Sequence, residues 1–192
     1  MKAKFIVLVV ALVIVCVVGF APGTVFAQID QKKTPEQQIE EALSALPESM
    51  RDDVRIEGFD EAGNPVTLRR GTSHIICHTD DPKVRSWTVT CFPKSLEAFV
   101  TRSEALTKAG EDTPVRIKTL KAEIESGAIV MPAVGALYMR TGNSVDIASA
   151  VMIVHVPNAT PKTTGLPMLP TRGWPWLAEA GTPMANIRIA RR

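Results

Sequence analysis

Two cysteines constrain the fold more than any other feature of the chain. Cys77 and Cys91 lie in two short strand-like runs, His74–His78 and Trp87–Phe92, which are separated by turn residues around Asp80–Pro82. An antiparallel hairpin closed through this turn sets Cys77 directly opposite Cys91. Facing Cβ atoms in such a pair lie about 4.5–5.5 Å apart, slightly beyond the disulfide range, so a modest local adjustment closes the bond. The spacing therefore predicts a structural disulfide within a hairpin.

The first 27 residues have the three parts of a secretory signal peptide. Two lysines precede the apolar stretch Phe5–Phe20, and Pro22 and Gly23 follow it before the small residues Val25 and Ala27. This stretch is short for a membrane span, which needs about 20 apolar residues. We expect cleavage after Ala27 and a secreted or periplasmic location. The alternative is an uncleaved anchor, in which case this segment is the chain's one membrane contact.

The balance of charged residues and the expected export exclude some classes of function. The chain has 22 basic and 20 acidic residues, so loss of Lys2 and Lys4 with the signal peptide leaves 20 of each. Phosphate binding needs a surplus of basic side chains on one face, so this balance disfavours a polybasic binder of nucleic acid or of a lipid surface, and we expect no nucleic-acid partner. In an oxidising compartment a lone pair of thiols forms a disulfide more often than a metal site, which agrees with pairing of Cys77 and Cys91.

The 165 residues after the signal peptide are enough for one domain, which we place at 34–192 after a disordered segment at 28–33. A capping box at Thr34–Gln37 begins a helix that Pro47 ends. Further helices are expected between 93 and 110 and between 113 and 127, and strands at 54–58, 66–70, 74–78, 87–92, 134–139, 148–156 and 186–190. Six prolines from Pro157 to Pro183 predict a long loop without regular elements. The order of elements predicts an α+β fold: an antiparallel meander, two or three helices and a Pro-rich C-terminal loop region.

Three histidines are the most suggestive side chains for catalysis or metal binding. His74 and His78 belong to the first run of the hairpin, and His155 lies near the end of a later apolar strand. On a strand, four steps of about 3.3 Å hold His74 and His78 roughly 13 Å apart, too far to share a metal ion bound at about 2.0–2.1 Å. His155 reaches either of them only through tertiary structure; otherwise it is a strand-end histidine with a satisfied hydrogen bond. We expect no metal and no cofactor, and name all three as possible ligand contacts.

The motif Trp174-Pro175-Trp176 lies in the Pro-rich region. Two aromatic rings around a proline suit stacking on a sugar ring or a peptide, or covering the edge of the core. Because only 5% of the residues are aromatic, we expect the large ones to be buried and favour the core-covering interpretation. Trp174 and Trp176 are the second group of possible ligand contacts.

Short motifs are spread along the chain from Val66 to Ile189. They are Leu68-Arg69-Arg70-Gly71-Thr72 before the first cysteine-bearing run, Gly135–Met139, Val151–Val154 followed by Pro157, Gly165–Pro167, and Trp174–Trp176 followed by Ala180–Pro183. In these motifs the chain resembles an uncharacterised family of exported bacterial proteins. The resemblance implies export and a cysteine pair. Family members have a histidine near the C-terminus where this chain has Asn186, so the resemblance implies no catalytic role.

Two functional hypotheses follow. The first is an exported, non-catalytic binding or accessory module stabilised by one disulfide, with an unknown partner. The alternative is a small extracytoplasmic metal-binding protein or hydrolase centred on His74, His78 and His155. The sequence has no G-x-S-x-G elbow, phosphate loop or dinucleotide fingerprint, so it identifies no reaction.

Overall fold

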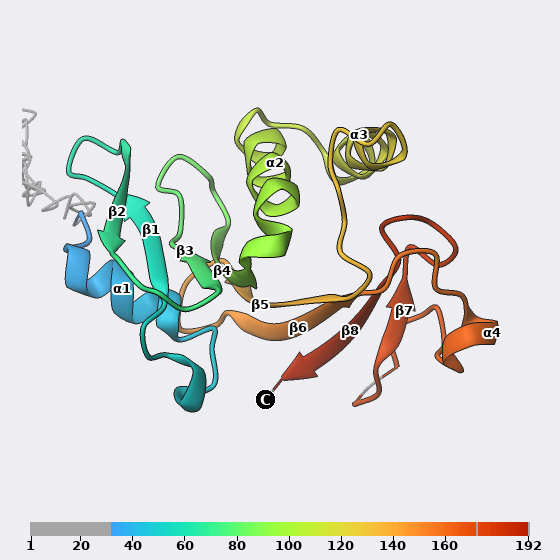
Figure 1. Cartoon of the computed structure of the whole chain (residues 1–192). Helices are drawn as coiled ribbons and strands as arrows, with labels where there is room; N and C mark the ends of the chain where they lie inside the picture. Colours follow the sequence, from blue (N-terminus) through green and yellow to red (C-terminus); the bar gives the residue numbers. More distant parts are fainter. Residues whose placement is uncertain (1–31, 172, 192) are drawn as a thin grey trace, which may run out of the picture. The chain divides into compact units, whose positions relative to one another are not determined.

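An eight-stranded sheet runs through the residues that the computed structural model describes, 32–171 and 173–191 (Figure 1). In spatial order its strands are β2-β1-β3-β4-β5-β6-β8-β7. Their bounds are β1 Arg55–Phe59, β2 Pro65–Arg69, β3 Ile75–His78, β4 Trp87–Pro93, β5 Gly135–Gly142, β6 Ser149–His155, β7 Trp176–Ala178 and β8 Asn186–Arg191. The predicted signal peptide and residues 28–31 of the predicted disordered segment lie outside the described residues.

The described residues also form four α-helices: α1 Pro35–Leu43, α2 Glu97–Lys108, α3 Thr113–Glu125 and α4 Pro161–Thr164. The predicted capping box begins α1, since Thr34 Oγ1 accepts the Gln37 N–H at 3.3 Å and Gln37 Oε1 accepts the Thr34 N–H at 2.8 Å. Gly110 and Gly127 have positive φ angles just beyond the ends of α2 and α3, a conformation that favours glycine. None of the helices in these ranges has the length and apolar character needed to cross a membrane.

The predicted α+β fold is confirmed, with a correction to the sheet topology. Most neighbouring strands are antiparallel, but β1 and β3 pair in parallel, with Ile56 opposite Cys77. In the predicted meander, β3 would pair with β2. Instead β3 lies between β1 and β4, with both of its faces buried, and the chain passes the start of β1 to reach this position. At this crossing a Cβ on Gly71 would lie 2.2 Å from the Asp53 carbonyl oxygen, so only glycine fits.

Helices cover the two faces of the sheet differently. α1 packs on one face, and α2 and α3 lie over the other (Figure 1). Side chains of β3 alternate between the two cores: Ile75 and Cys77 face α1, whereas Ile76 faces α2. The fully buried side chains of these two cores include Phe92, Leu46, Ile56, Leu96, Leu120, Val54 and Val89.

The Pro-rich C-terminal region contains two short regular elements that the sequence did not predict. Thr160 caps α4, with Pro161 at its first position, and Gly165 ends the helix in the left-handed conformation. β7 follows Pro175 and pairs with β8 at the edge of the sheet, where a preceding proline is tolerated. A small third core, formed by Ala159, Leu177 and Ala185, holds this region together.

Candidate functional site

Cys77 and Cys91 form the predicted disulfide between β3 and β4. They are register partners with Cα atoms 4.0 Å apart, and Ile76 faces Phe92 in the same ladder. Both cysteines are fully buried beneath α1. Thiol–disulfide exchange requires an attacking thiolate to reach the sulfur, so this buried bond is structural. The hairpin register predicted from the cysteine spacing is confirmed.

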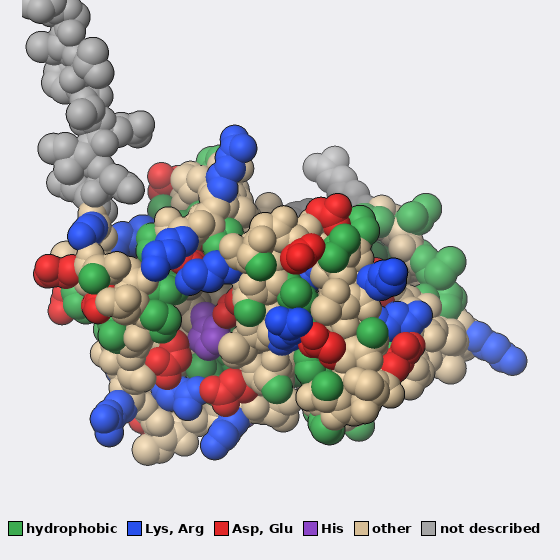
Figure 2. Space-filling model, turned by 90° about the horizontal axis from the view of Figure 1, so that it is seen from above, with side chains coloured by type: hydrophobic (Ala, Val, Ile, Leu, Met, Phe, Trp, Pro, Cys, Tyr) green, Lys and Arg blue, Asp and Glu red, His purple; other side chains and the backbone are tan. Residues whose placement is uncertain are grey.

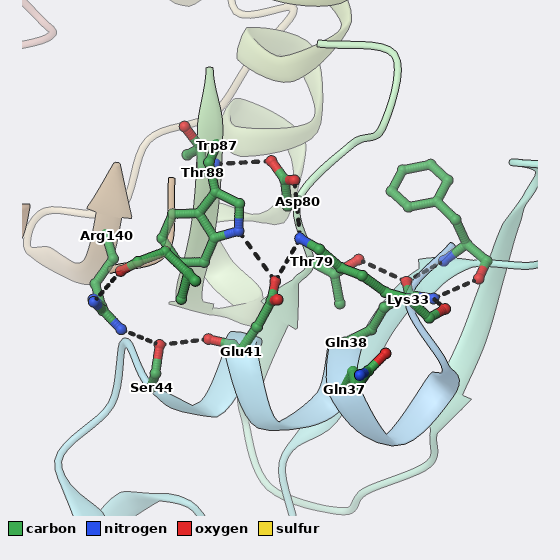
Figure 3. Close-up of polar contacts among 12 residues, drawn as sticks. Lys33, Gln37, Gln38, Glu41, Ser44, Thr79, Asp80, Trp87, Thr88 and Arg140 are labelled. Atoms are coloured by element: carbon green, nitrogen blue, oxygen red, sulfur yellow. Dashed lines mark hydrogen bonds and ion pairs between the residues drawn. The ribbon is translucent and has the colours of Figure 1, made fainter. Parts of the chain in front are cut away.

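Next to this disulfide, polar side chains converge on Trp87 from α1, from the turn after β3 and from β5 (Figure 3). The indole N–H of Trp87 donates to Glu41 Oε2 at 3.1 Å, and Lys33 Nζ contacts the same oxygen at 2.7 Å. Lys33 also reaches Asp80 Oδ2 at 3.4 Å, and Asp80 Oδ1 accepts the Thr88 N–H at 2.9 Å. One ammonium group therefore links two carboxylates, although Lys33 belongs to the predicted disordered segment.

Trp87 itself contacts two cations. Lys33 Nζ lies 5.9 Å and Arg140 Cζ 5.5 Å from its ring centroid, within the range of cation–π attraction. Burial raises the pKa of Asp80, with a smaller contribution from Glu41, while the Thr88 N–H and Lys33 oppose the rise. A carboxyl group with a raised pKa is a candidate general acid in a cleft. Here, however, donors of the chain occupy both carboxylates, so the network ties α1 to the disulfide hairpin.

Gln38 makes a second link between α1 and the sheet. Its side-chain N–H donates to the Phe59 carbonyl at 2.9 Å, and its Oε1 accepts the Phe59 N–H at 3.0 Å, as a neighbouring strand would. Sequence reasoning missed Gln38, Glu41, Asp80, Trp87 and Arg140. The one usable signal was Gln38, a polar residue four positions before Ala42 and hence on the apolar face of the helix.

The structure places two of the three histidines in separate surroundings on the α2 side. His74 is exposed before β3, whereas His78 Nδ1 lies 2.7 Å from Glu104 Oε2 and its ring meets the Phe92 ring edge-on at 4.8 Å. A side chain of α2 thus contacts His78. Among residues 32–171 and 173–191, no group of three His, Cys, Asp or Glu side chains has the arrangement needed to hold a metal ion.

His155 is buried at the end of β6, where its ring meets that of Phe99 edge-on at 4.9 Å. Burial, reinforced by the nearby Arg188 charge, lowers the pKa of His155 to about 4, so the ring is neutral at pH 7. The predicted satisfied hydrogen bond is wrong for Nδ1, which has no partner within the described part of the chain. Its cross-strand neighbour Asn186 instead donates to the Met184 carbonyl and accepts from Arg188.

The two tryptophans of the Pro-rich region differ. Trp176 is half-buried in β7, but Trp174 is 61% exposed, so the predicted core-covering role is wrong for Trp174. The Trp174 N–H donates to the Thr171 carbonyl at 3.0 Å, and Gly173 has a φ of +74° between them. This tight turn presents the Trp174 ring to solvent.

Trp174 belongs to a loop that we call the apolar hairpin, defined as residues 167–171 and 173–177. Its base is closed by the Leu177 N–H, which donates to the Pro167 carbonyl at 2.8 Å. Met168 and Leu169 are 60% and 76% exposed, and Leu177 is buried in the third core. In Figure 1 the segment leading into β7 projects beyond the sheet on the side away from α2 and α3. The hairpin therefore combines a fixed base with an exposed apolar tip.

The surface over α2 and α3 has a different character. Figure 2 shows acidic and basic side chains interspersed over this face. A shallow, open depression runs along α3, lined by Val115, Lys118, Thr119, Ala122, Glu123 and Ser126. Glu123 is paired with Arg102 at 2.7 Å, and this pairing lowers the pKa of Glu123. The depression collects none of the predicted contact residues.

Comparison of the chain with protein-family models, with curated proteins and with solved structures gives no match. The function is therefore argued from the chemistry of the described residues. Among the predicted site residues, the cysteines are structural, His78 and His155 pack beneath α2, and Trp174 presents a large apolar surface to solvent.

Proposed function

We propose that the protein is an exported, non-catalytic binding or accessory module whose contact surface is the apolar hairpin. One observation carries this proposal: Met168, Leu169 and Trp174 are each at least 60% exposed within one short hairpin. Clustered exposed apolar side chains mark interaction surfaces, and tryptophan is enriched among residues that dominate binding energies. Because Leu177 anchors the hairpin base in the third core, little additional ordering is needed on binding.

Three features support export. The first 27 residues have the pattern of a cleaved signal peptide, and the motifs from Val66 to Ile189 resemble an exported bacterial family. The disulfide Cys77–Cys91 agrees with an oxidising compartment. Export predicts that the isolated protein begins at Gln28, and N-terminal sequencing together with mass spectrometry without reductant tests this.

The histidine-centred alternative has weaker support. His78 is engaged by Glu104 and Phe92, and His155 lies beneath α2 with a pKa lowered by burial. Metal analysis of natively purified protein separates the two proposals. A stoichiometric transition metal that is lost in His78→Ala and His155→Ala variants would contradict the binding-module proposal.

Site-specific photocrosslinking in the producing cell tests the contact surface. A photoreactive residue in place of Leu169 should form crosslinks to a component of the envelope. The matched control replaces Val130, which is apolar and 78% exposed but lies between α3 and β5. Equal crosslinking from both positions, or none from position 169, would contradict the assignment of the hairpin as the contact surface.

A further inference from the structure

The apolar hairpin exposes a cluster of large apolar side chains, and this exposure restricts what it binds. Thr171 and Trp174 form a bridge, and Leu169 lies two residues before Thr171. A rigid protein partner would need a matching pocket for these side chains, whereas a fluid lipid interface adapts to them. Tryptophan prefers the boundary between lipid headgroups and acyl chains, where its ring is apolar and its N–H stays hydrated.

Prolines reduce the number of backbone donors in the hairpin. Backbone N–H groups without partners are costly in hydrocarbon. Pro167, Pro170 and Pro175 have no N–H group, and the N–H groups of Trp174 and Leu177 are bonded within the hairpin. The proline content that works against regular structure here also removes backbone donors from the part of the chain that would enter the interface.

Charge along the same part of the chain favours an anionic surface. No Asp or Glu occurs between Asp146 and Glu179, and the Lys and Arg residues in this stretch leave it positively charged. One of them is Lys162, which is exposed on α4. Basic side chains beside an inserted apolar segment add attraction to anionic lipid headgroups. The same headgroups would repel an acidic stretch.

We infer that the apolar hairpin binds the surface of a membrane containing anionic phospholipid, with Leu169 and Trp174 entering the interfacial layer. This inference rests on the proposed function and names the ligand of the same surface. The sequence analysis placed a membrane contact in the N-terminal segment only if that segment is not cleaved, whereas a contact through the hairpin remains after cleavage. Met168 lies next to Leu169 and is also exposed.

Tryptophan fluorescence of the full chain tests the inference directly. Trp87 is buried, Trp176 is half-buried, and residues 1–31 contain no tryptophan, so Trp174 is the one expected to respond to lipid. The probe is a vesicle of phosphatidylglycerol and brominated phosphatidylcholine. Any membrane attachment through residues 1–31 is shared by all variants and does not by itself quench Trp174.

On these vesicles, the wild-type emission should shift to the blue and be quenched by the brominated chains. Trp176→Phe should retain most of this quenching, whereas Trp174→Phe should lose it. Leu169→Ser should lower the vesicle partition coefficient of the hairpin at least about tenfold, since it removes a large apolar side chain from the interfacial layer. Vesicles of phosphatidylcholine alone should quench the wild type less than vesicles that contain phosphatidylglycerol.

Three results would overturn the inference: unquenched wild-type emission, equal quenching in Trp174→Phe, or a solution dimer that Leu169→Ser abolishes. The last result would assign the hairpin to a second copy of the chain. A crosslink from position 169 to a protein, with Trp174 unquenched, would leave the binding-module proposal standing and remove the membrane as its ligand. Absence of any crosslink from position 169 would contradict both the binding-module proposal and the membrane inference.

Discussion

The two ends of the sheet are stabilised in different ways. Around β3 and β4, α1 covers one face and α2 the other, and the Cys77–Cys91 disulfide and the contacts of Trp87 add further links. Around β7 and β8, a small core centred on Leu177 anchors the loops, and Trp174 remains exposed. The disulfide and the Trp87 contacts thus tie the β3–β4 end to α1, whereas the β7 end exposes Met168, Leu169 and Trp174. The residues that we propose for binding therefore lie where they contribute little to folding.

Removal of the disulfide should strongly destabilise the β3–β4 end of the sheet. The double variant Cys77→Ala and Cys91→Ala should lower the free energy of unfolding by about 3 kcal/mol, as expected for a closed loop of about 15 residues. Urea unfolding followed by circular dichroism measures the loss. Reduction of the wild-type protein provides a second measurement if the variant does not fold. A loss below about 1 kcal/mol would show that the bond is not the main stabilising link of this end.

The buried His155 should make stability depend on pH. Its pKa is about 4 in the folded protein and about 6.5 when unfolded, so the unfolded state binds the proton first as pH falls. The stabilising contribution is present above pH 6.5 and is lost as pH falls towards 4. Between pH 7 and 4, the free energy of unfolding should fall by about 2–3 kcal/mol more in wild type than in His155→Leu.

Urea titrations at several pH values measure this difference, and the exposed His74 provides the control. His74→Asn should follow the wild-type curve. If His155→Leu follows it as well, the buried position of His155 does not determine the acid sensitivity of the fold.

Loss of the α1 cap should have a smaller effect. In Thr34→Ala, the Gln37 N–H loses its side-chain acceptor, so the free energy of unfolding should fall by about 1 kcal/mol. Thr101→Ala provides the control because Thr101 is exposed within α2 and caps no helix. Equal losses in both variants would indicate a general effect of removing threonine and would contradict the role of the cap.

Substitution at the hairpin tip should have the smallest effect on stability. Leu169→Ser replaces an exposed side chain and should change the free energy of unfolding by less than about 0.5 kcal/mol. Leu177→Ala, at the buried base of the same hairpin, should lower it by about 2–5 kcal/mol. Thermal or urea unfolding of both variants gives the comparison. A large loss in Leu169→Ser would mean that the tip serves folding and would contradict its assignment to binding.

Local chemistry explains which parts of the fold were predictable. The Cys77–Cys91 register follows from spacing within one hairpin, and the cap at Thr34 from four consecutive residues. The parallel pairing of β1 with β3 depends on burial of β3 on both faces, which only the folded chain establishes. Sequence patterns gave no means of anticipating that strand order.

The same distinction applies to the candidate site. His74 lies just before β3 and His78 at its end, and Glu104 of α2 contacts His78. The exposure of Trp174 was missed because the expectation used the average behaviour of large aromatic residues, whereas the turn at Gly173 determines where this ring points. The contacts around Trp87 join segments distant in sequence, so no spacing rule identifies them.

We expect binding at the apolar hairpin and not at the histidines. Amide hydrogen exchange of the full chain, with and without vesicles containing phosphatidylglycerol, distinguishes the two regions among residues 32–171 and 173–191. Vesicles should add protection only at the hairpin and its immediate flanks, with β3 and β4 unchanged. Unchanged exchange at the hairpin, or added protection around His78 and α2 instead, would contradict this expectation.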